Sequence, residues 1–448
     1  MNRQEYWCPF LLLAVAIGLA YFNAFQGAFQ FDDYNVVVND ARIHSWQAWF
    51  ASMPGIRPLL KASYTLNWTS GLGLFGFHLF NLAVHAVNSM LVYWLARQFF
   101  EQISPLPENE GRNAALFAAL LFALHPVQTE AVTYISGRSS SLSASFYLAS
   151  LLTYAQGRRS ASLRLIRFAS PVLFLFALAV KETAITLPLA LLLWESVRCE
   201  RMSVRNILAA QWLHWLTMVC ALLAMLFHPV YLDLLAFSLD LRPLGANLSA
   251  AVRGLAYLLA QLFFPHHLNI DPDIATQTTW NIELIAMAGL LTFLLATGFA
   301  SLRRIPWLAF GVLWFFLQLL PTHTLVPRLD IANERQLYLA AIGPIFALSA
   351  IGFRLSARWN AIPLRTATLL MCAVLALATH FRNRDYRDEV SLWEATAALS
   401  PGKARVFNNL GFAYEQAERK EAARSAYLRA LAIDPRQTRA AENLAALK

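Results

Sequence analysis

The chain has 448 residues, of which 58% belong to the apolar and aromatic set AVILMFWYC and only 14% are charged. A soluble globule of this length needs more charged surface, since about 25% charged residues are usual. The composition excludes an ordinary soluble enzyme, a disordered chain and a fibrous repeat, and it predicts an all-α, polytopic membrane protein. In such a protein the net charge of +9 indicates anionic membrane lipids as partners, so no nucleic-acid partner is expected.

The membrane part begins with an apolar run at 7–25, preceded by Arg3, which predicts a first span whose N-terminus lies inside. A cleaved signal peptide is the alternative interpretation of this run. Together with the first span at 7–25, ten further apolar runs predict about eleven transmembrane helices. The further runs cover 77–100, 113–125, 139–156, 168–180, 183–197, 207–228, 282–302, 306–322, 338–354 and 363–380. The apolar stretch 248–264 contains Arg253, and we expect it to be re-entrant or to lie at the outer interface.

The distribution of arginine sets the predicted topology. The turns expected on the inner side all carry arginine, as the positive-inside rule requires; they lie at 97–112, 158–167, 198–205, 303–304 and 354–365. An odd number of spans then places the C-terminus outside, in a periplasm or a lumen. We therefore divide the chain into a transmembrane domain at 1–380, whose first outer loop covers 26–76, and a C-terminal region at 381–448.

The C-terminal region 381–448 is polar, charged and helix-rich, and it carries the 34-residue tetratricopeptide pattern. Small residues, aromatic residues and a terminating proline fall at the expected offsets of one full repeat: Leu410, Gly411, Tyr414, Ala423, Tyr427, Ala430 and Pro435. The same spacing relates Tyr427 to Trp393 and Leu410 to Leu444, which adds a half-repeat on each side. Because fewer than three repeats are not stable alone, we expect the region to pack on the outer face of the membrane domain or on a protein partner.

Charged residues of the outer loops form the candidate site. Asp32 and Asp33 are adjacent carboxylates directly after the first span, and acidic residues at a membrane surface tend to be functional. An exposed loop pair or a helix cap is the alternative. Outward basic residues are candidates for holding an anion, with solvated or snorkelling charges as the alternative; they are Arg57, Lys61, Arg138, Lys181, Arg242, Arg253, Arg328 and Arg335.

Motifs in these loops resemble the class C glycosyltransferases, and most closely the transmembrane-and-tetratricopeptide-repeat O-mannosyltransferases. The motifs are, in chain order, FDDYN, RPL, FHLFNLAVHAVN, LHPVQTEAVTYISGRSSSL, KETAIT, LFFPHHLNID, ERQLYL and RNRDYRDEVSLWEATAALSP. The resemblance spans nearly the whole chain. The animal members of this family carry many repeats, whereas this chain carries about one repeat and two halves.

The resemblance implies an integral membrane enzyme that moves a sugar, mannose by the nearest family, from a polyprenyl-phosphate donor to a hydroxyl of a protein or glycolipid acceptor on the outer side. The chemistry of the residues agrees with this function. A carboxylate can take the proton of the acceptor hydroxyl, and a phosphate leaving group needs cations but no acid. Direct displacement would invert the anomeric carbon.

The family pattern also implies residue roles. Asp32 would be the general base, and Asp33 would orient the acceptor or a metal ion. The lipid phosphate would be held by Arg57, Arg138, Lys181 and Arg335, with Lys61 in reserve. The sugar or acceptor site would be shaped by His125, Glu130 and Glu182. A divalent metal is left open as a cofactor, because no cluster of ligands decides it.

Two further functions stay open as alternatives. One is a ligase that moves a preassembled oligosaccharide from a polyprenyl diphosphate. The other is a membrane anchor or transporter that is not an enzyme and displays the repeats to a protein partner. The arginine-rich inner loops and the short repeat region favour a bacterial inner membrane, with the site and the repeats on the periplasmic side and undecaprenyl phosphate as the lipid.

Overall fold

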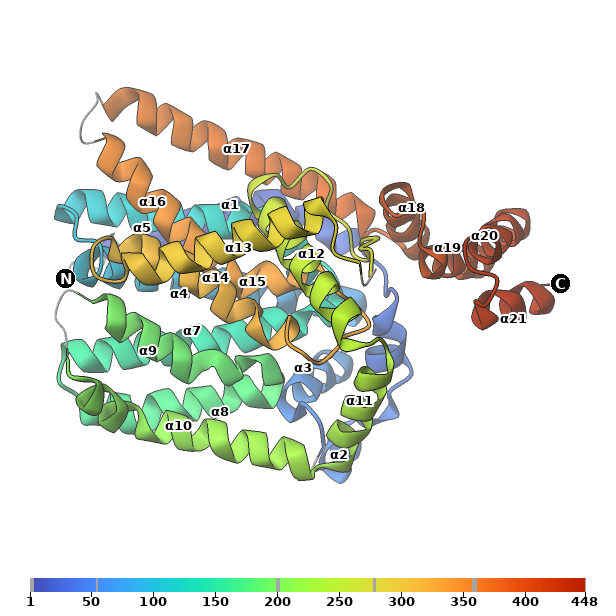
Figure 1. The fold of residues 1–448 in the computed structure, drawn as a ribbon, viewed down its shortest axis with the longest axis horizontal. Coiled ribbons are helices and arrows are strands. Elements are labelled where there is room, and N and C mark those ends of the chain that lie inside the picture. The colour runs from blue at the N-terminus through green and yellow to red at the C-terminus, as the bar shows by residue number, and fades with distance from the viewer. Residues whose placement is uncertain (1–3, 54, 199–201, 277–278, 357–360, 448) are drawn as a thin grey trace.

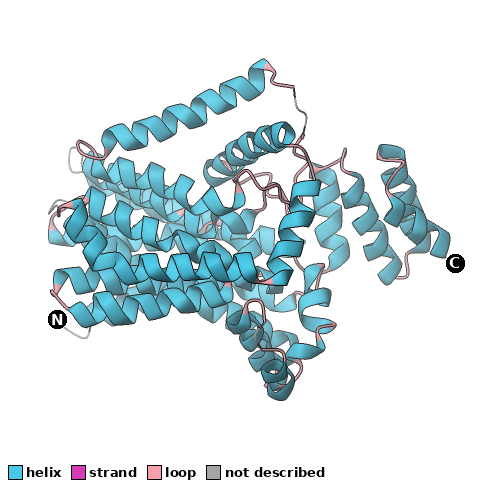
Figure 2. Cartoon of the chain, turned by 60° about the horizontal axis from the view of Figure 1, so that its bottom comes forward, coloured by secondary structure: helices cyan, strands magenta, loops and turns pink. Residues whose placement is uncertain are grey.

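The computed structural model describes residues 4–53, 55–198, 202–276, 279–356 and 361–447, which form helices and no strands (Figures 1 and 2). The helices are α1 (Gln4–Tyr21), α2 (Trp46–Ala51), α3 (Pro58–Thr69), α4 (Gly73–Gln102), α5 (Glu108–Leu124), α6 (Thr129–Val132), α7 (Arg138–Arg159), α8 (Ser170–Val180), α9 (Leu187–Val197), α10 (Val204–Phe227), α11 (Pro229–Asp240), α12 (Leu244–Phe263), α13 (Ile282–Ser301), α14 (Pro306–Leu319), α15 (Leu337–Ala340), α16 (Ile342–Ser356), α17 (Ala361–Asp385), α18 (Glu389–Leu399), α19 (Ala404–Gln416), α20 (Lys420–Ile433) and α21 (Thr438–Ala446).

Several of these helices are long and apolar enough to cross a membrane. In the described part four satisfy this by length and composition alone, namely Pro9–Gln26, Gly73–Gln102, Val204–Phe227 and Ile282–Ser301. Two bent pairs raise the number to six; they are Glu108–Leu124 with Pro126–Val132, bent by 53°, and Glu334–Ala340 with Ile342–Leu355, bent by 55°. These helices indicate an all-α, multi-pass membrane protein, and the count of eleven spans stays a prediction.

Local chemistry explains why one predicted span is bent. α5 ends at Leu124 because His125 precedes Pro126, and a residue before proline is disfavoured in the α conformation. His125 is accordingly extended, with φ −72° and ψ 127°. Its ring keeps this turn in place, since Nδ1 accepts from the Val127 N–H at 3.3 Å and Nε2 lies 3.0 Å from the Leu262 carbonyl oxygen.

The long helices run side by side, so their connections gather at two ends of the bundle (Figure 1). One end, here called the tail end, is formed by residues 27–53, 55–72, 125–137, 181–186, 264–276 and 320–336, and α18–α21 lie against it. At the opposite end, Arg159 pairs with Glu101 at 2.6 Å and Arg158 with Glu195 at 2.7 Å. The turns predicted to be outer thus meet at one end, and those predicted to be inner meet at the other.

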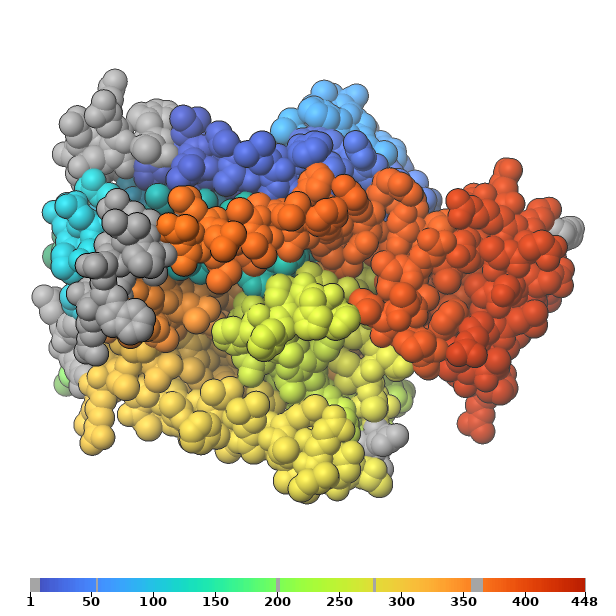
Figure 3. All heavy atoms as spheres, turned by 90° about the horizontal axis from the view of Figure 1, so that it is seen from above, coloured from blue at the N-terminus to red at the C-terminus, as the bar shows by residue number. Residues whose placement is uncertain are grey.

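The C-terminal helices α18–α21 project from the tail end (Figure 3). Their core includes Trp393 and Leu410, and α19 packs closely against α20. A Cβ at Gly411 would come within 2.5 Å of the Tyr427 ring, so only glycine fits this crossing. The Asn269 side chain, in the loop after α12, donates to Ser400 Oγ at 2.8 Å, which ties the end of α18 to the bundle.

Candidate active site

Asp33 holds the loop after α1 in place. Its buried carboxylate accepts hydrogen bonds from the Gln30 N–H at 3.0 Å, from the Ser136 N–H at 2.8 Å and from the Ser136 hydroxyl. Burial raises the pKa of Asp33 to about 7, and the bonds from Ser136 and Gln30 act in the opposite direction. Because internal donors occupy this carboxylate, it fixes the loop that carries its neighbour Asp32.

Asp32 lies half-buried beside residues from distant parts of the chain. Its backbone N–H donates to the Tyr134 hydroxyl at 3.0 Å. Burial raises the pKa of Asp32 above its ordinary value, while the charge of Arg335 lowers it. Asp330 and Arg405 are the other charged groups that act on this carboxylate. Asp32 therefore faces a set of charges from the loop 320–336 and from α19.

Four cations from three segments of the chain act on one another at the tail end, and we call them the cation cluster: Arg57, Lys181, Arg328 and Arg335. Burial, and next the charge of Arg335, lowers the pKa of Lys181 well below its ordinary value. The same two causes lower the pKa of Arg328. The Lys181 ammonium donates to Ser140 Oγ at 2.7 Å.

Carboxylates neutralise two members of the cation cluster. Arg57 makes a two-pronged ion pair with Glu182, with Nη2 to Oε2 at 2.8 Å, and Tyr231 donates to the same carboxylate at 2.6 Å. Arg335 meets the buried carboxylate of Glu130 through its backbone N–H at 2.9 Å and its Nε at 3.3 Å. Arg57 also has a left-handed backbone at φ +52°, which starts α3 and aims the side chain at Glu182.

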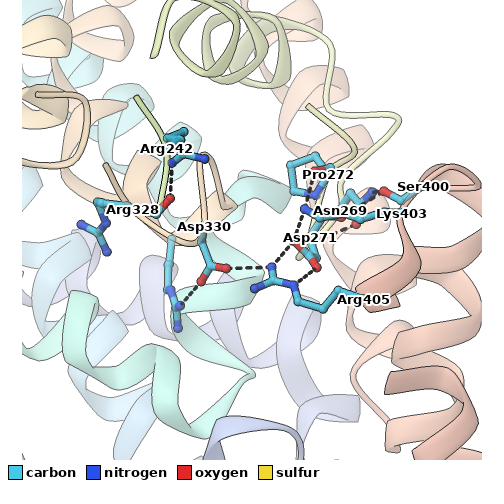
Figure 4. A network of polar contacts seen from close by, with 10 residues as sticks. Arg242, Asn269, Asp271, Pro272, Arg328, Asp330, Ser400, Lys403 and Arg405 are labelled. Carbon is cyan, nitrogen blue, oxygen red and sulfur yellow. Dashed lines mark hydrogen bonds and ion pairs between the residues drawn. The ribbon is translucent and has the colours of Figure 1, made fainter. Parts of the chain in front are cut away.

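Lys181 and Arg328 have no carboxylate partner among the described residues. The guanidinium of Arg328 makes no hydrogen bond or ion pair there, and in Figure 4 it points away from the network around Asp330, while its carbonyl oxygen accepts from Arg242. The cation cluster therefore carries surplus positive charge, the electrostatic setting that favours an anion such as a phosphate. Arg328 was one of the outward cations in the sequence, but nothing there distinguished it from solvated ones.

The structure places Arg138 in the helix packing. Its guanidinium donates to Asn81 Oδ1 at 2.6 Å and to the backbone carbonyls of Ser63 and Phe77 at 3.0 Å each, and it is fully buried. The ring of Phe80 stacks on it, with the guanidinium carbon 4.4 Å from the ring centre. These contacts join α3, α4 and α7 and leave Arg138 outside the cation cluster.

Lys61 and His125 also lie in other surroundings. Lys61 pairs with Asp40 at 3.6 Å, and Arg42 occupies the same carboxylate at 2.6 Å. Both nitrogens of His125 have backbone partners, at Val127 and Leu262, so the ring closes the turn after α5. Neither side chain is among the groups that act on Asp32.

The described residues offer no ready metal site. In that part of the chain, no group of three or more His, Cys, Asp or Glu side chains is placed to hold a metal ion. Internal hydrogen bonds occupy Asp33, and the charges of Arg335 and Arg405 act on Asp32, so the surroundings of Asp32 in the described part do not form a site for a divalent ion.

Two larger cavities differ in their distance from the cation cluster. One, of about 970 Å³, opens at the opposite end of the bundle and is lined by Arg97, Arg112 and Arg159 among others. The other, of about 470 Å³, is a largely leucine- and phenylalanine-lined groove between α9, α12, α13 and α14, which we call the apolar groove. His323 lines the apolar groove and also a small cavity that contains Arg328, so the groove ends beside the cation cluster.

Comparison with known proteins gives consistent relatives, although no family model matches the chain. Protein O-mannosyl-transferase TMTC3 of Mus musculus is 25% identical over 95% of this chain and 51% of the relative. Protein O-mannosyl-transferase Tmtc3 of Drosophila melanogaster is 26% identical over 92% of this chain and 54% of the relative. The chain thus spans about half the length of the curated relatives it matches.

Among solved structures, the crystal structure of the Archaeoglobus fulgidus oligosaccharyltransferase tethered to an acceptor peptide is similar at a TM-score of 0.42 and 13% identity, over 94% of this chain and 59% of that one. This level of likeness carries no argument about the fold. The resemblance predicted from the motifs is confirmed, since this chain is similar to protein O-mannosyl-transferases over almost its whole length.

Proposed function

We propose that this protein is a class C membrane glycosyltransferase that moves one sugar from a polyprenyl phosphate to an acceptor hydroxyl. One observation carries the proposal: the charge of Arg335 acts on the Asp32 carboxylate, and Arg335 belongs to the cation cluster, in which Lys181 and Arg328 lack a carboxylate partner among the described residues. Such a transfer needs a base that takes the proton of the acceptor hydroxyl and cations that stabilise the leaving phosphate. The names of the relatives support mannose as the sugar and a protein as the acceptor.

The reaction follows from the polarity of the two groups. An acceptor hydroxyl is a weak nucleophile, and Asp32 takes its proton as the new C–O bond forms. The bond between the anomeric carbon and the phosphate oxygen breaks at the same time, and the phosphate leaves with the electron pair. Lys181 and Arg328 stabilise the developing charge, so no acid is needed. Attack opposite the leaving group inverts the anomeric carbon.

The apolar groove supports a lipid carrier. It is lined by leucine and phenylalanine from α9, α12, α13 and α14, and it ends at His323 beside the small cavity of Arg328. A polyprenyl chain lying in this groove would bring its phosphate to the cation cluster without leaving the apolar layer. The substrate is therefore held by apolar contact along the chain and by charge at the head.

We extend the proposal to topology. The tail end is assigned to the periplasmic side of a bacterial inner membrane, with about eleven spans in the transmembrane domain 1–380 and the C-terminal region 381–448 outside. The close fit of Gly411 against Tyr427, with Ala423 and Ala430 buried at the same crossing, supports a tetratricopeptide repeat in that region. A repeat at the tail end is suited to docking a protein acceptor or partner.

The test is transfer of mannose from purified polyprenyl-phosphate mannose to a synthetic peptide rich in serine and threonine. Asp32→Asn should lower kcat by about 10²–10⁴-fold, because loss of a general base costs this much. Asp240→Asn, an exposed carboxylate at the end of α11, is the matched control and should keep the wild-type rate. Wild-type turnover in Asp32→Asn would contradict the proposed role.

The same preparation separates the alternatives. Intact masses of the acceptor should rise by one hexose. A larger increment obtained with a lipid diphosphate donor would support the oligosaccharide ligase instead. A membrane-anchored scaffold would be supported by two results together. The wild type would transfer no sugar, and removal of residues 381–448 alone would reproduce the cellular effect of deleting the whole protein.

A further inference from the structure

The residue before Asp32 has an unusual backbone. Phe31 lies in the left-handed region at φ +48°, which is uncommon and strained for any residue other than glycine. Such a conformation persists only where surrounding contacts impose it. The contacts on Phe31 therefore determine where the Asp32 carboxylate points.

Those contacts come from α18, in the C-terminal region. The Phe31 N–H donates to the Glu389 carboxylate at 3.0 Å. The ring of Phe31 meets the buried ring of Trp393 edge to face, with centroids 5.2 Å apart. One side chain of α18 thus fixes the backbone of Phe31, and a second one fixes its ring.

The chain just before Phe31 follows the segment before α18. The Gln30 side-chain amide donates to the Tyr386 carbonyl oxygen, and the Ala28 N–H donates to the Arg387 carbonyl oxygen at 3.0 Å. A Cβ at Gly27 would lie only 3.1 Å from the Tyr386 oxygen, so the two segments are in close contact. The segment 27–31, which leads to Asp32, is therefore attached to the C-terminal region along its length.

A second connection reaches the cation cluster. Arg405, on α19, bonds to Asp271 and, at 2.8 Å, to Asp330 (Figure 4). Asp330 in turn lies 3.9 Å from Arg335. Lys403 donates to the Pro272 carbonyl at 2.9 Å and pairs with Asp271, which anchors α19 to the loop after α12. The loop that carries Arg328 and Arg335 is therefore held by α19.

We propose that α18 and α19 are a positioning element of the active site. Glu389 and Trp393 set the direction of the base through Phe31, and Arg405 sets the phosphate-binding loop through Asp330. This inference rests on the proposed function, since it assigns the two connections to the two halves of that reaction. Glu389 and Trp393 touch neither reacting group, and Arg405 acts on Asp32 only through its charge, so all three are positioning residues.

The first connection is tested by Glu389→Ala in the full-length protein. Its kcat should fall about 10-fold at an unchanged donor KM, because a small misplacement of a base costs rate and not donor binding. Glu389→Gln retains an oxygen that can accept from the Phe31 N–H and should restore most of kcat. The control is Glu394→Ala, on the same helix, whose carboxylate bonds to Tyr414 within the C-terminal helices.

The second connection is tested by Arg405→Ala, which should raise the donor KM about 5-fold or more with a smaller effect on kcat, since it frees the phosphate-binding loop. Arg405→Lys keeps the charge near Asp330, so its donor KM should lie between those of the wild type and Arg405→Ala. The same KM and kcat changes in both alanine variants would contradict the assignment of separate connections. Wild-type kinetics in both would overturn the inference.

Hydrogen exchange of residues 28–38 distinguishes this inference from the proposed function. Faster exchange in Glu389→Ala together with a lower kcat supports positioning, whereas faster exchange with wild-type kcat overturns it. A wild-type protein that transfers no sugar contradicts the proposed function instead. In that case hydrogen exchange alone tests whether α18 holds residues 28–38 in place. An unchanged exchange rate in Glu389→Ala overturns this attachment, and a faster rate supports it.

Discussion

At the scale of single residues, the two adjacent aspartates differ in their surroundings. Asp33 is fully buried and accepts three hydrogen bonds from Gln30 and Ser136, whereas Asp32 is half-buried and the charges of Arg335, Asp330 and Arg405 act on it. The sequence predicts that this pair matters but offers no means to tell one from the other, because their partners Tyr134 and Ser136 lie more than 100 residues away. The contrast in burial supports Asp32 as the base and Asp33 as its anchor.

Tyr134→Phe tests the ionisation of Asp32. Burial raises the pKa of Asp32, and the Tyr134 hydroxyl lowers it, so its loss should raise the pKa further. A general base works only when it is deprotonated, so kcat rises as pH increases through this pKa. The acid limb of a kcat–pH profile should therefore move to higher pH in Tyr134→Phe. A limb that moved to lower pH in folded protein would contradict the assignment.

At the scale of helices, the outward arginines separate into two kinds. Arg138 joins α3, α4 and α7 through buried hydrogen bonds, whereas Arg328 lies on a loop and has no such bonds among the described residues. The sequence marks both as outward cations that could hold an anion, and the family resemblance implies a phosphate role for Arg138 but not for Arg328. Burial depends on which helices pack together, and arginine content alone does not determine that.

Matched substitutions distinguish these two kinds of arginine. Arg138→Met should lower the free energy of unfolding by about 3 kcal/mol, because it leaves the Asn81, Ser63 and Phe77 oxygens unsatisfied. Arg328→Met should leave the melting temperature unchanged and weaken binding of polyprenyl phosphate about 10-fold, since a charge-assisted hydrogen bond is lost. Thermal unfolding and lipid titration on both proteins check this. The reverse pattern would contradict the division.

At the scale of the whole molecule, the alternation of arginine-rich and motif-bearing turns along the sequence predicts which turns lie at the same end of the helix bundle. Arginine-rich turns meet at the end opposite the cation cluster, where Arg158 and Arg159 find Glu195 and Glu101, and the motif-bearing turns meet at the tail end. The number of spans is harder to predict, because the apolar run predicted at 113–125 ends at the turn of His125 and Pro126, beyond which a bent helix continues to Val132. The role of the C-terminal helices could not be foreseen either, since the contact of Glu389 with Phe31 joins residues far apart in sequence.

We propose that a lipid phosphate binds at Lys181 and Arg328, in the cation cluster whose member Arg335 acts on Asp32. An electron cryomicroscopy map of the full-length protein with added polyprenyl phosphate tests this binding site. Phosphate density should lie within hydrogen-bonding distance of the Lys181 ammonium and the Arg328 guanidinium, with the lipid chain in the apolar groove. Phosphate density elsewhere, such as the cavity lined by Arg97 and Arg159 at the opposite end, would contradict it.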